Sequence, residues 1–152
     1  MYKIDNDKLK KIKYKAVNDR ASAMKKADRA FSLYIRTRDA QEYYGKAFKC
    51  ISCGRLLPIR KADCGHYVNR RHMSLRYSEE NCNAQCISCN RFDEGNIYNY
   101  RKGLFEKIGG EALLALEASK YSTRKISTFE LEEIAKEYKK KVKEFPYQIK
   151  EE

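Results

Sequence analysis

Apolar residues recur every three or four positions in the first third of the chain, which is the spacing of one helix face. The repeat is made by Met24, Ala27, Phe31, Tyr34 and Ile35. Lysines and arginines occupy much of the remaining surface of this segment. The pattern predicts an amphipathic helix within residues 6–44 that packs one face on a core and exposes a basic face, with Gly45 as its stop signal.

The last third of the chain has the clearest helical pattern. Ser127 and Glu130 have the form of a capping box, which marks the start of a helix. One apolar stripe follows, made by Leu131, Ile134, Ala135, Tyr138, Val142 and Phe145. Pro146 ends the pattern. Such a stripe predicts a helix that packs on the core.

The middle of the chain changes character. Short apolar stretches in residues 46–85 are broken by glycines such as Gly54 and Gly65. This pattern predicts a tight turn followed by irregular strands that form a hairpin. A helix is expected to begin at Cys86 and to break near Gly95.

Two short helical stretches, residues 97–108 and 111–120, complete the pattern. The whole predicts an α+β fold that is mainly helical, with a small central core between long terminal helices. We divide it into a basic N-terminal helical arm (1–45), a core (46–110) and a C-terminal helical extension (111–152), expected to form one compact unit.

Two C-x-x-C pairs, separated by 32 residues, indicate a metal site in this core. A tetrahedral Zn²⁺ ion takes four soft ligands, and each pair supplies two of them from one tight turn. We therefore predict a zinc site formed by Cys50, Cys53, Cys86 and Cys89. Four cysteines fill the coordination shell of the ion, so we expect this zinc to be structural. Any chemistry would then come from residues that the zinc-bound core, which we call the frame, holds in position.

Two further cysteines, Cys64 and Cys82, lie outside these pairs. We expect both to be small buried side chains. The alternative is that one of them replaces one of the four C-x-x-C cysteines, which we call the knuckle cysteines, as a metal ligand. The basic N-terminus lacks the apolar stretch of a secretory signal, and no apolar run approaches the ~20 residues of a membrane span. We expect a protein of the reducing cytoplasm that has no membrane partner, with its cysteines as thiols or metal ligands.

The net charge of +12 is unevenly spread. Residues 1–49 carry 14 Lys and Arg against 6 Asp and Glu, whereas residues 50–95 and 96–152 each have a net charge of +2. A basic arm beside a nearly balanced core points to a polyanionic partner, with nucleic acid as the leading candidate. The alternative is that excess lysine only keeps the protein in solution.

The segment between the cysteine pairs carries the candidate chemistry. It contains both histidines of the chain, His66 and His72, together with Asp63, Arg70 and Arg71. Histidine titrates near neutrality and can take a proton from water, and arginine pairs with phosphate through two hydrogen bonds. A lone histidine is more often structural than catalytic. However, His66 lies between the two metal-binding cysteine pairs, and this position favours a catalytic role.

With Asn81 before the second cysteine pair and Asn90 directly after it, the arrangement resembles the HNH nucleases, also called ββα-metal or treble-clef zinc nucleases. The resemblance implies that His66 activates the attacking water, that Asn81 orients His66 by a hydrogen bond, and that Asn90 helps to hold a divalent metal. The common pattern has Asp directly before His. Here two residues separate Asp63 from His66, so this chain departs from the common pattern at Asp63.

A narrower resemblance covers about residues 25–110. The stretches "KADRAFSLYIRTRDA", "ADCGHYVNRRHMSLRY", "NCNAQCISCNRFDEGN" and "YRKGLFEKIGG" are similar to the phage NinG (Rap) recombination protein family. The family implies a phage-encoded recombination endonuclease that acts in the bacterial host cell on branched DNA such as Holliday junctions. Two symmetric cuts resolve a four-way junction, so a homodimer is a reasonable expectation.

The expected reaction is phosphodiester hydrolysis assisted by one Mg²⁺ or Mn²⁺ ion. We expect His66 to act as the base and Asn90 to hold the ion, with Asp63 as a second candidate ligand. His72 is either a further metal or phosphate contact or a surface residue. The phosphate-binding arginines are expected to be Arg70, Arg71 and Arg76.

Two other hypotheses compete with that of a metal-dependent nuclease. The first is a zinc module that binds DNA without cutting it, and the second is a protein-interaction adaptor that docks through its last helix. Asn96 presents a similar choice, because it is either a metal ligand or, as we favour, part of a turn with Gly95.

Overall fold

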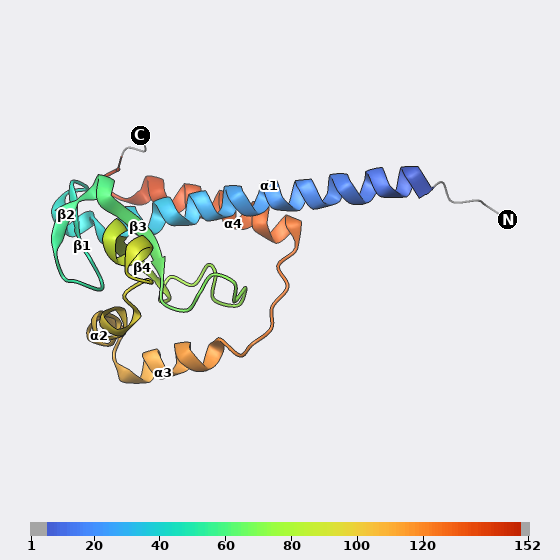
Figure 1. Cartoon of the computed structure of the whole chain (residues 1–152). Coiled ribbons are helices and arrows are strands. Elements are labelled where there is room, and N and C mark those ends of the chain that lie inside the picture. The colour runs from blue at the N-terminus through green and yellow to red at the C-terminus, as the bar shows by residue number, and fades with distance from the viewer. Residues whose placement is uncertain (1–5, 150–152) are drawn as a thin grey trace.

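The computed structural model describes residues 6–149 and is mainly helical (Figure 1). Its elements follow the chain in the order α1 (Asn6–Asp39), η1 (Gln41–Tyr43), β1 (Ala47–Lys49), β2 (Leu56–Pro58), η2 (Ile59–Lys61), β3 (Ala62–His66), β4 (Cys82–Cys86), η3 (Ser88–Phe92), α2 (Ile97–Ile108), α3 (Gly110–Ser119) and α4 (Thr128–Glu144). The predicted α+β class, with long helices at both ends, is confirmed. No helix within the described range is both long and apolar enough to cross a membrane.

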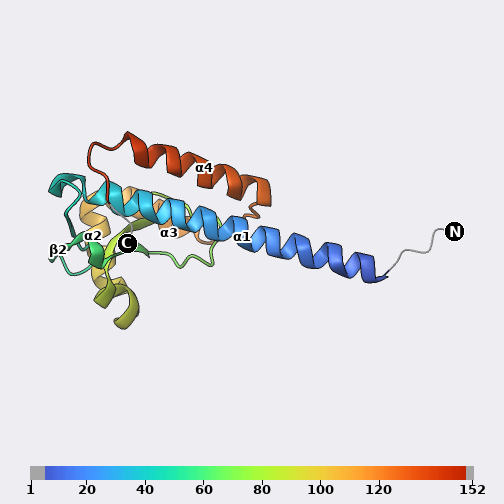
Figure 2. The same cartoon turned by 90° about the horizontal axis from the view of Figure 1, so that it is seen from above.

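The two long helices pack side by side and run in the same direction (Figures 1 and 2). Their apolar stripes face each other and form the largest core cluster, in which Phe31 and Tyr138 meet edge to face at 4.8 Å between ring centroids. The capping box is present, because the Ser127 hydroxyl accepts from the Glu130 amide and the Glu130 carboxylate accepts from the Ser127 amide. Both predicted stripes therefore serve as core packing.

The strands form two separate antiparallel pairs, where the sequence predicted a single hairpin. Strands β1 and β2 make a short hairpin whose turn carries the first cysteine pair. Strands β3 and β4 pair over five residues each, with His66 opposite Cys82 and Ala62 opposite Cys86. Residues 67–81 connect β3 to β4 and have no helix or strand of their own.

The second cysteine pair lies where a strand passes into a helical turn. This turn begins at Ile87 and ends at Phe92, close to the helix that the sequence predicted from Cys86 to near Gly95. Cys86 is the last residue of β4, and a short π-helical turn, η3, then carries Cys89. Glu94, Gly95 and Asn96 all have positive φ, so the turn predicted around Gly95 and Asn96 is confirmed.

Helix α2 packs directly against the first cysteine turn. The contact depends on Gly103, because a Cβ atom at that position would lie 2.1 Å from the carbonyl oxygen of Ile51. Tyr100 of the same helix is fully buried, and its hydroxyl donates to the carbonyl oxygen of Gly65 in β3. Helix α2 therefore connects the cysteine frame to the strand that carries His66.

Candidate metal centre and adjoining cleft

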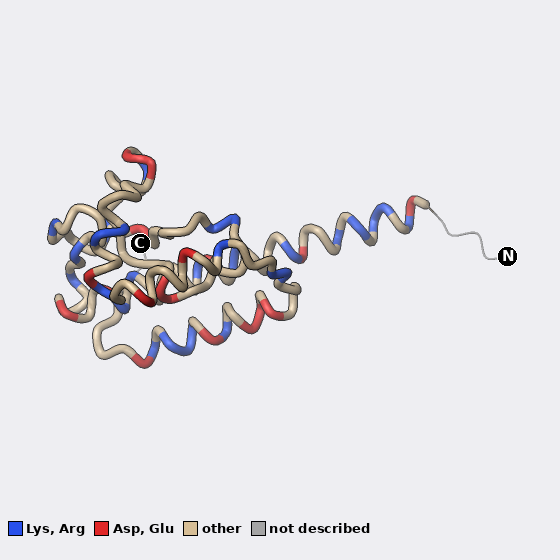
Figure 3. Tube along the Cα trace, turned by 90° about the horizontal axis from the view of Figure 1, so that it is seen from below, with Lys and Arg blue, Asp and Glu red and all other residues tan. Residues whose placement is uncertain are grey.

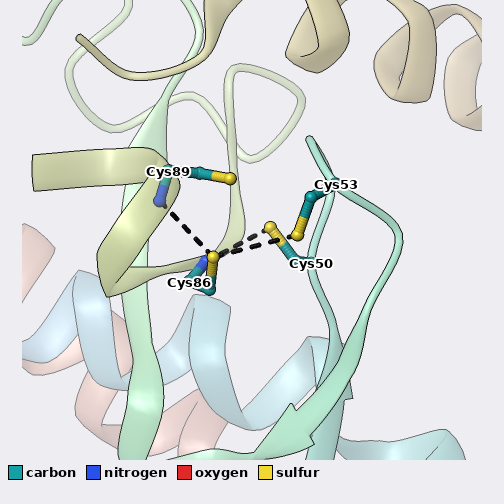
Figure 4. Close-up of side chains that lie close together, drawn as sticks. All are labelled: Cys50, Cys53, Cys86 and Cys89. Carbon is teal, nitrogen blue, oxygen red and sulfur yellow. Dashed lines mark hydrogen bonds between the residues drawn. The ribbon is translucent and has the colours of Figure 1, made fainter. Parts of the chain in front are cut away.

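The four predicted zinc cysteines lie together (Figure 4). Cys50 and Cys53 come from the β1–β2 turn, and Cys86 and Cys89 from the junction of β4 and η3. Their sulfur atoms all lie within 4.8 Å of one another, and Cys53 Sγ is 3.9 Å from Cys86 Sγ. A tetrahedral zinc ion with Zn–S bonds of about 2.3 Å needs sulfurs about 3.8 Å apart. The four side chains therefore fit a structural zinc ion.

Hydrogen-bond donors surround these sulfurs. The amide of Cys86 donates to Cys50 Sγ at 3.3 Å, and the amide of Cys89 donates to Cys86 Sγ at 3.4 Å. Donors of this kind favour the thiolate form over the thiol and orient the ligands of a metal. The frame is thus suited to four thiolates.

The pKa values of the thiols differ across the site. Burial raises the pKa of Cys50, and burial raises that of Cys89 to about 12. For Cys53 burial acts in the same direction, but hydrogen bonds from Arg55 outweigh it and lower the pKa to about 6. Cys53 is therefore ionised near neutral pH, whereas Cys50 and Cys89 release their protons when a metal ion replaces them.

His66 is the last residue of β3 and lines a cleft beside the metal centre. Its Nε2 lies 3.0 Å from the carbonyl oxygen of Arg76. A carbonyl oxygen only accepts, so Nε2 carries the hydrogen and Nδ1 keeps the basic lone pair. Burial lowers the pKa of His66 below its usual 6.5, so the ring is neutral at pH 7.

The cleft consists of two adjoining hollows of about 240 and 530 Å³. Both are lined by Cys64, His66, Arg70 and Asn90, and we call them together the His66 cleft. Arg70 is exposed at its rim, on the segment between β3 and β4. The cleft therefore brings together a neutral imidazole, an amide and a guanidinium from three separate parts of the chain.

Asn81 fixes the loop beside His66 and does not contact the ring. Its fully buried amide accepts from the backbone nitrogen of Val68 at 2.7 Å and donates to the carbonyl oxygens of Val68 and Leu75. The hydrogen bond expected between Asn81 and His66 is replaced by the one from His66 to the Arg76 carbonyl. Asn81 thus acts on His66 only through residues 67–81.

Asp63 and Asn90 meet at the side of the cleft. Nδ2 of Asn90 donates to Oδ2 of Asp63 at 2.9 Å, and Arg91 binds both carboxylate oxygens at 2.7 Å. Burial raises the pKa of Asp63, but the hydrogen bonds from Arg91 and Asn90 outweigh it, so the net pKa is lowered. Asp63 is therefore a carboxylate at neutral pH, with Arg91 as its partner.

The other predicted site residues lie in different surroundings. His72 lies outside the cleft, with Nδ1 3.0 Å from the carbonyl oxygen of Lys120. Arg76 binds both carboxylate oxygens of Asp28 in α1, at 2.8 and 2.5 Å, so its guanidinium holds the loop against α1. Arg71 is exposed beside Arg70. Of the three predicted phosphate ligands, Arg70 and Arg71 are the ones at the surface.

Two residues of the metal centre have roles that the sequence pattern did not predict. Arg55 donates through Nε to Cys53 Sγ at 3.3 Å, and Asn96 donates through Nδ2 to Cys89 Sγ at 3.4 Å. Arg55 follows the first cysteine pair by only two residues, which is a signal that could have indicated it. The contact of Asn96 depends on its left-handed backbone, which turns the side chain back to the metal centre.

Comparisons with known proteins agree on one family. The family described as "Bacteriophage Lambda NinG protein" matches residues 2–147. Protein ninG of Escherichia phage lambda is 35% identical over 139 residues, which are 91% of this chain and 64% of that protein. Protein ninG of Salmonella phage P22 is 36% identical over 139 residues, again 91% of this chain and 64% of that protein.

A third relative, protein ninG of Escherichia phage 933W, is 34% identical over 139 residues, which are 91% of this chain and 65% of that protein. The chain spans just under two thirds of the length of these curated relatives. No solved structure gives a significant match.

Proposed function

The chain belongs to the bacteriophage NinG family, and from this premise we propose that it is a metal-dependent endonuclease that hydrolyses phosphodiester bonds in branched DNA such as Holliday junctions. The HNH-like order of His66, Asn81 and Asn90 within a zinc frame supports the reaction class. The branched substrate comes from the resemblance to the recombination family.

One observation carries the proposal. The ring of His66 is held through Nε2 by the Arg76 carbonyl, in a cleft that also contains Asn90 and Arg70. Burial keeps the imidazole neutral at pH 7, because it lowers the pKa. A neutral, oriented imidazole with a basic Nδ1 is what general-base activation of water requires.

The proposed step follows from that geometry. Nδ1 of His66 takes a proton from a water molecule while the water oxygen forms a bond to the scissile phosphorus. The bond from phosphorus to the leaving sugar oxygen breaks, and this oxygen takes a proton from solvent. The products are a phosphate monoester and a sugar hydroxyl. Arg70 and Arg71 bind the phosphate oxygens, and Arg76 keeps His66 in place through its carbonyl.

Asp63 and Asn90 are the candidate ligands for the divalent ion. A carboxylate offers about four lone-pair sites, and Arg91 and Asn90 together use three on Asp63, which leaves one on Oδ1. Oδ1 of Asn90 accepts no hydrogen bond from the residues that the structure describes. These oxygens suit Mg²⁺ or Mn²⁺, and an ion held there would stabilise the charge that develops on the phosphate and the leaving oxygen.

The test is cleavage of a labelled four-way junction and a matched linear duplex with Mg²⁺, Mn²⁺ or EDTA. We expect metal-dependent cutting of the junction by the wild-type protein. His66→Ala should lower the rate by about 10²–10⁴-fold, the usual contribution of a general base. His72→Ala is the matched control and should cut at close to the wild-type rate, because His72 lies outside the cleft.

The outcomes separate the proposal from its rivals. Unchanged cutting by His66→Ala would refute the role of the imidazole. Tight junction binding without cutting in any metal would indicate a zinc module that only binds DNA. Weak binding that is insensitive to salt would indicate an adaptor, because binding to DNA phosphates weakens steeply as salt rises.

A further inference from the structure

A second group of metal-ligating side chains lies apart from the cysteine knuckles. Cys64 and His66 lie two residues apart on β3, and Cys82 of β4 is paired with His66. Residues two apart on a strand, and residues directly opposite on neighbouring strands, project from the same face of a sheet. One ligand atom of each residue lies within 4.8 Å of the other two. The pairing of β3 with β4 therefore assembles this trio.

The chemistry of the trio is that of a zinc-class site. Two thiolates and an imidazole are ligands that Zn²⁺ prefers, whereas Mg²⁺ prefers oxygen. Two sulfurs on one zinc ion lie about 3.8 Å apart, so the separation between the two cysteine sulfurs needs to close by at most about 1 Å. The trio fits a thiophilic divalent ion with little rearrangement.

The surroundings of the trio leave one coordination position open. Cys82 is fully buried, whereas Cys64 and His66 are half-buried and line the His66 cleft. Three protein ligands, two of which line the cleft, leave the fourth position of a tetrahedral ion to water or another small ligand. Nε2 of His66 and Sγ of Cys82 lie 3.0 and 3.9 Å from the same carbonyl oxygen, that of Arg76, which holds these two side chains next to each other.

We propose that Cys64, His66 and Cys82 form a second metal site, which takes zinc or a similar thiophilic divalent ion and occupies the imidazole that activates water. Binding of the ion does not depend on the proposed function. Inhibition of cleavage by the ion does rest on the proposed function. A neutral imidazole has one basic lone pair, and an ion bound to the ring uses it, so no base remains to accept the proton from water. The protein is therefore inhibited by zinc while Mg²⁺ supports cleavage.

The site is tested first by counting ions. The purified protein is saturated with Zn²⁺, or with Co²⁺ as a spectroscopic probe, and freed of excess metal before the bound ions are measured. We expect two ions per chain for the wild type and one for Cys64→Ser. The ion that remains in Cys64→Ser is bound by Cys50, Cys53, Cys86 and Cys89, and its presence shows that the variant is folded. His72→Gln removes the only other histidine and should keep two ions.

The count has clear contrary results. One ion per wild-type chain at saturation would overturn the second site, and so would two ions on Cys64→Ser. With Co²⁺ the loss in Cys64→Ser should remove the spectrum of a mixed sulfur and nitrogen site and leave that of a four-sulfur site. A spectrum with only the four-sulfur component in the wild type would also overturn it.

Inhibition is tested by adding zinc to the Mg²⁺-dependent cleavage reaction. Each protein is compared with its own rate without added zinc. Wild-type cleavage should fall about tenfold or more as the second ion binds, and Cys64→Ser should resist the same zinc concentration. Full wild-type activity with two ions bound would overturn the inhibitory role. If no variant cuts under any condition, the proposed function fails while the ion count still decides whether the site exists.

Discussion

The fully buried side chain of Asn81 holds residues 67–81 from within. It makes three hydrogen bonds to the backbone at Val68 and Leu75. Asn81→Ala leaves these groups unpaired, and each unsatisfied buried group costs about 1–3 kcal/mol. We expect the free energy of unfolding in urea to fall by roughly 2–5 kcal/mol, allowing for partial rescue by water.

Asn69→Ala serves as the control for this prediction. Asn69 is exposed, and within residues 6–149 its side chain accepts one hydrogen bond, from the amide of Arg71, so we expect a loss below about 1 kcal/mol. Equal stability of the wild type and Asn81→Ala would show that the loop does not depend on Asn81. A large loss in both variants would show a general sensitivity of the loop to truncation.

The sequence was informative for residues whose role depends on local spacing. Each C-x-x-C turn brings two sulfurs together by itself, so the four knuckle cysteines could be identified without a fold. The hydrogen-bond partner of His66 could not be identified from the sequence. The Arg76 carbonyl is placed by an ion pair between Arg76 and Asp28, which are 48 residues apart in the sequence. A contact of that range has no local signal.

At the scale of elements, the loop from β3 to β4 is tied to both long helices by Glu79. Its carboxylate accepts from the hydroxyls of Tyr34 and Tyr138 and from Nζ of Lys141. Burial raises the pKa of Glu79, but the hydrogen bonds from Tyr34 and Lys141 outweigh it, so the net pKa lies below the usual 4.5. Folding therefore favours the carboxylate over the neutral acid.

A depressed pKa gives a stabilisation that is present above the unfolded pKa and is lost as the pH falls through the folded pKa. We therefore expect Glu79→Gln to be less stable than the wild type at pH 7, with a difference that shrinks once the pH drops below about 4.5. Urea unfolding of both proteins at several pH values measures the difference. Glu133→Gln, which breaks an exposed pair with Lys136, should show almost no difference. A constant deficit for Glu79→Gln across the pH range would contradict the role of its charge.

Element boundaries could be predicted where the chain has end signals. Helix α4 begins directly after the Ser127 capping box, and α2 has the bounds expected from its apolar spacing. Strand β4 had a weaker signal. Cys82, Ala84 and Cys86 alternate with polar Asn83 and Gln85, but the run is only five residues long and all five are buried. Its pairing with β3 depends on residues distant in the sequence, so it followed only from the structure.

At the scale of the whole molecule, the basic helix α1 extends well past the first residue of α4 (Figures 1 and 2). The body begins near Arg20, whose guanidinium donates to the carbonyl oxygen of Ile126. Residues 6–19 are all exposed and carry five lysines against two aspartates. Figure 3 shows these lysines along the projecting turns. At about 1.5 Å per residue this arm is about 20 Å long, enough to follow a DNA backbone.

The arm gives the proposed function a prediction that does not depend on cleavage. Changing Lys10, Lys11, Lys13 and Lys15 to glutamine should weaken junction binding and flatten its salt dependence. The slope of log K against log salt should fall by about 0.9 for each lysine that contacts a phosphate, and so by up to about 3.6. Binding measured at several salt concentrations gives both quantities.

The control must remove the same charge elsewhere, because net charge alone steers a protein toward DNA. Changing Lys136, Lys139, Lys140 and Lys143 of α4 to glutamine does so on a helix that alternates basic and acidic residues (Figure 3). If the arm contacts phosphates, the arm variant loses much more affinity and slope than the α4 variant. Equal losses would mean that the total charge attracts DNA and that the arm has no special contact, which would leave the rim of the His66 cleft, with Arg70 and Arg71, as the remaining candidate surface.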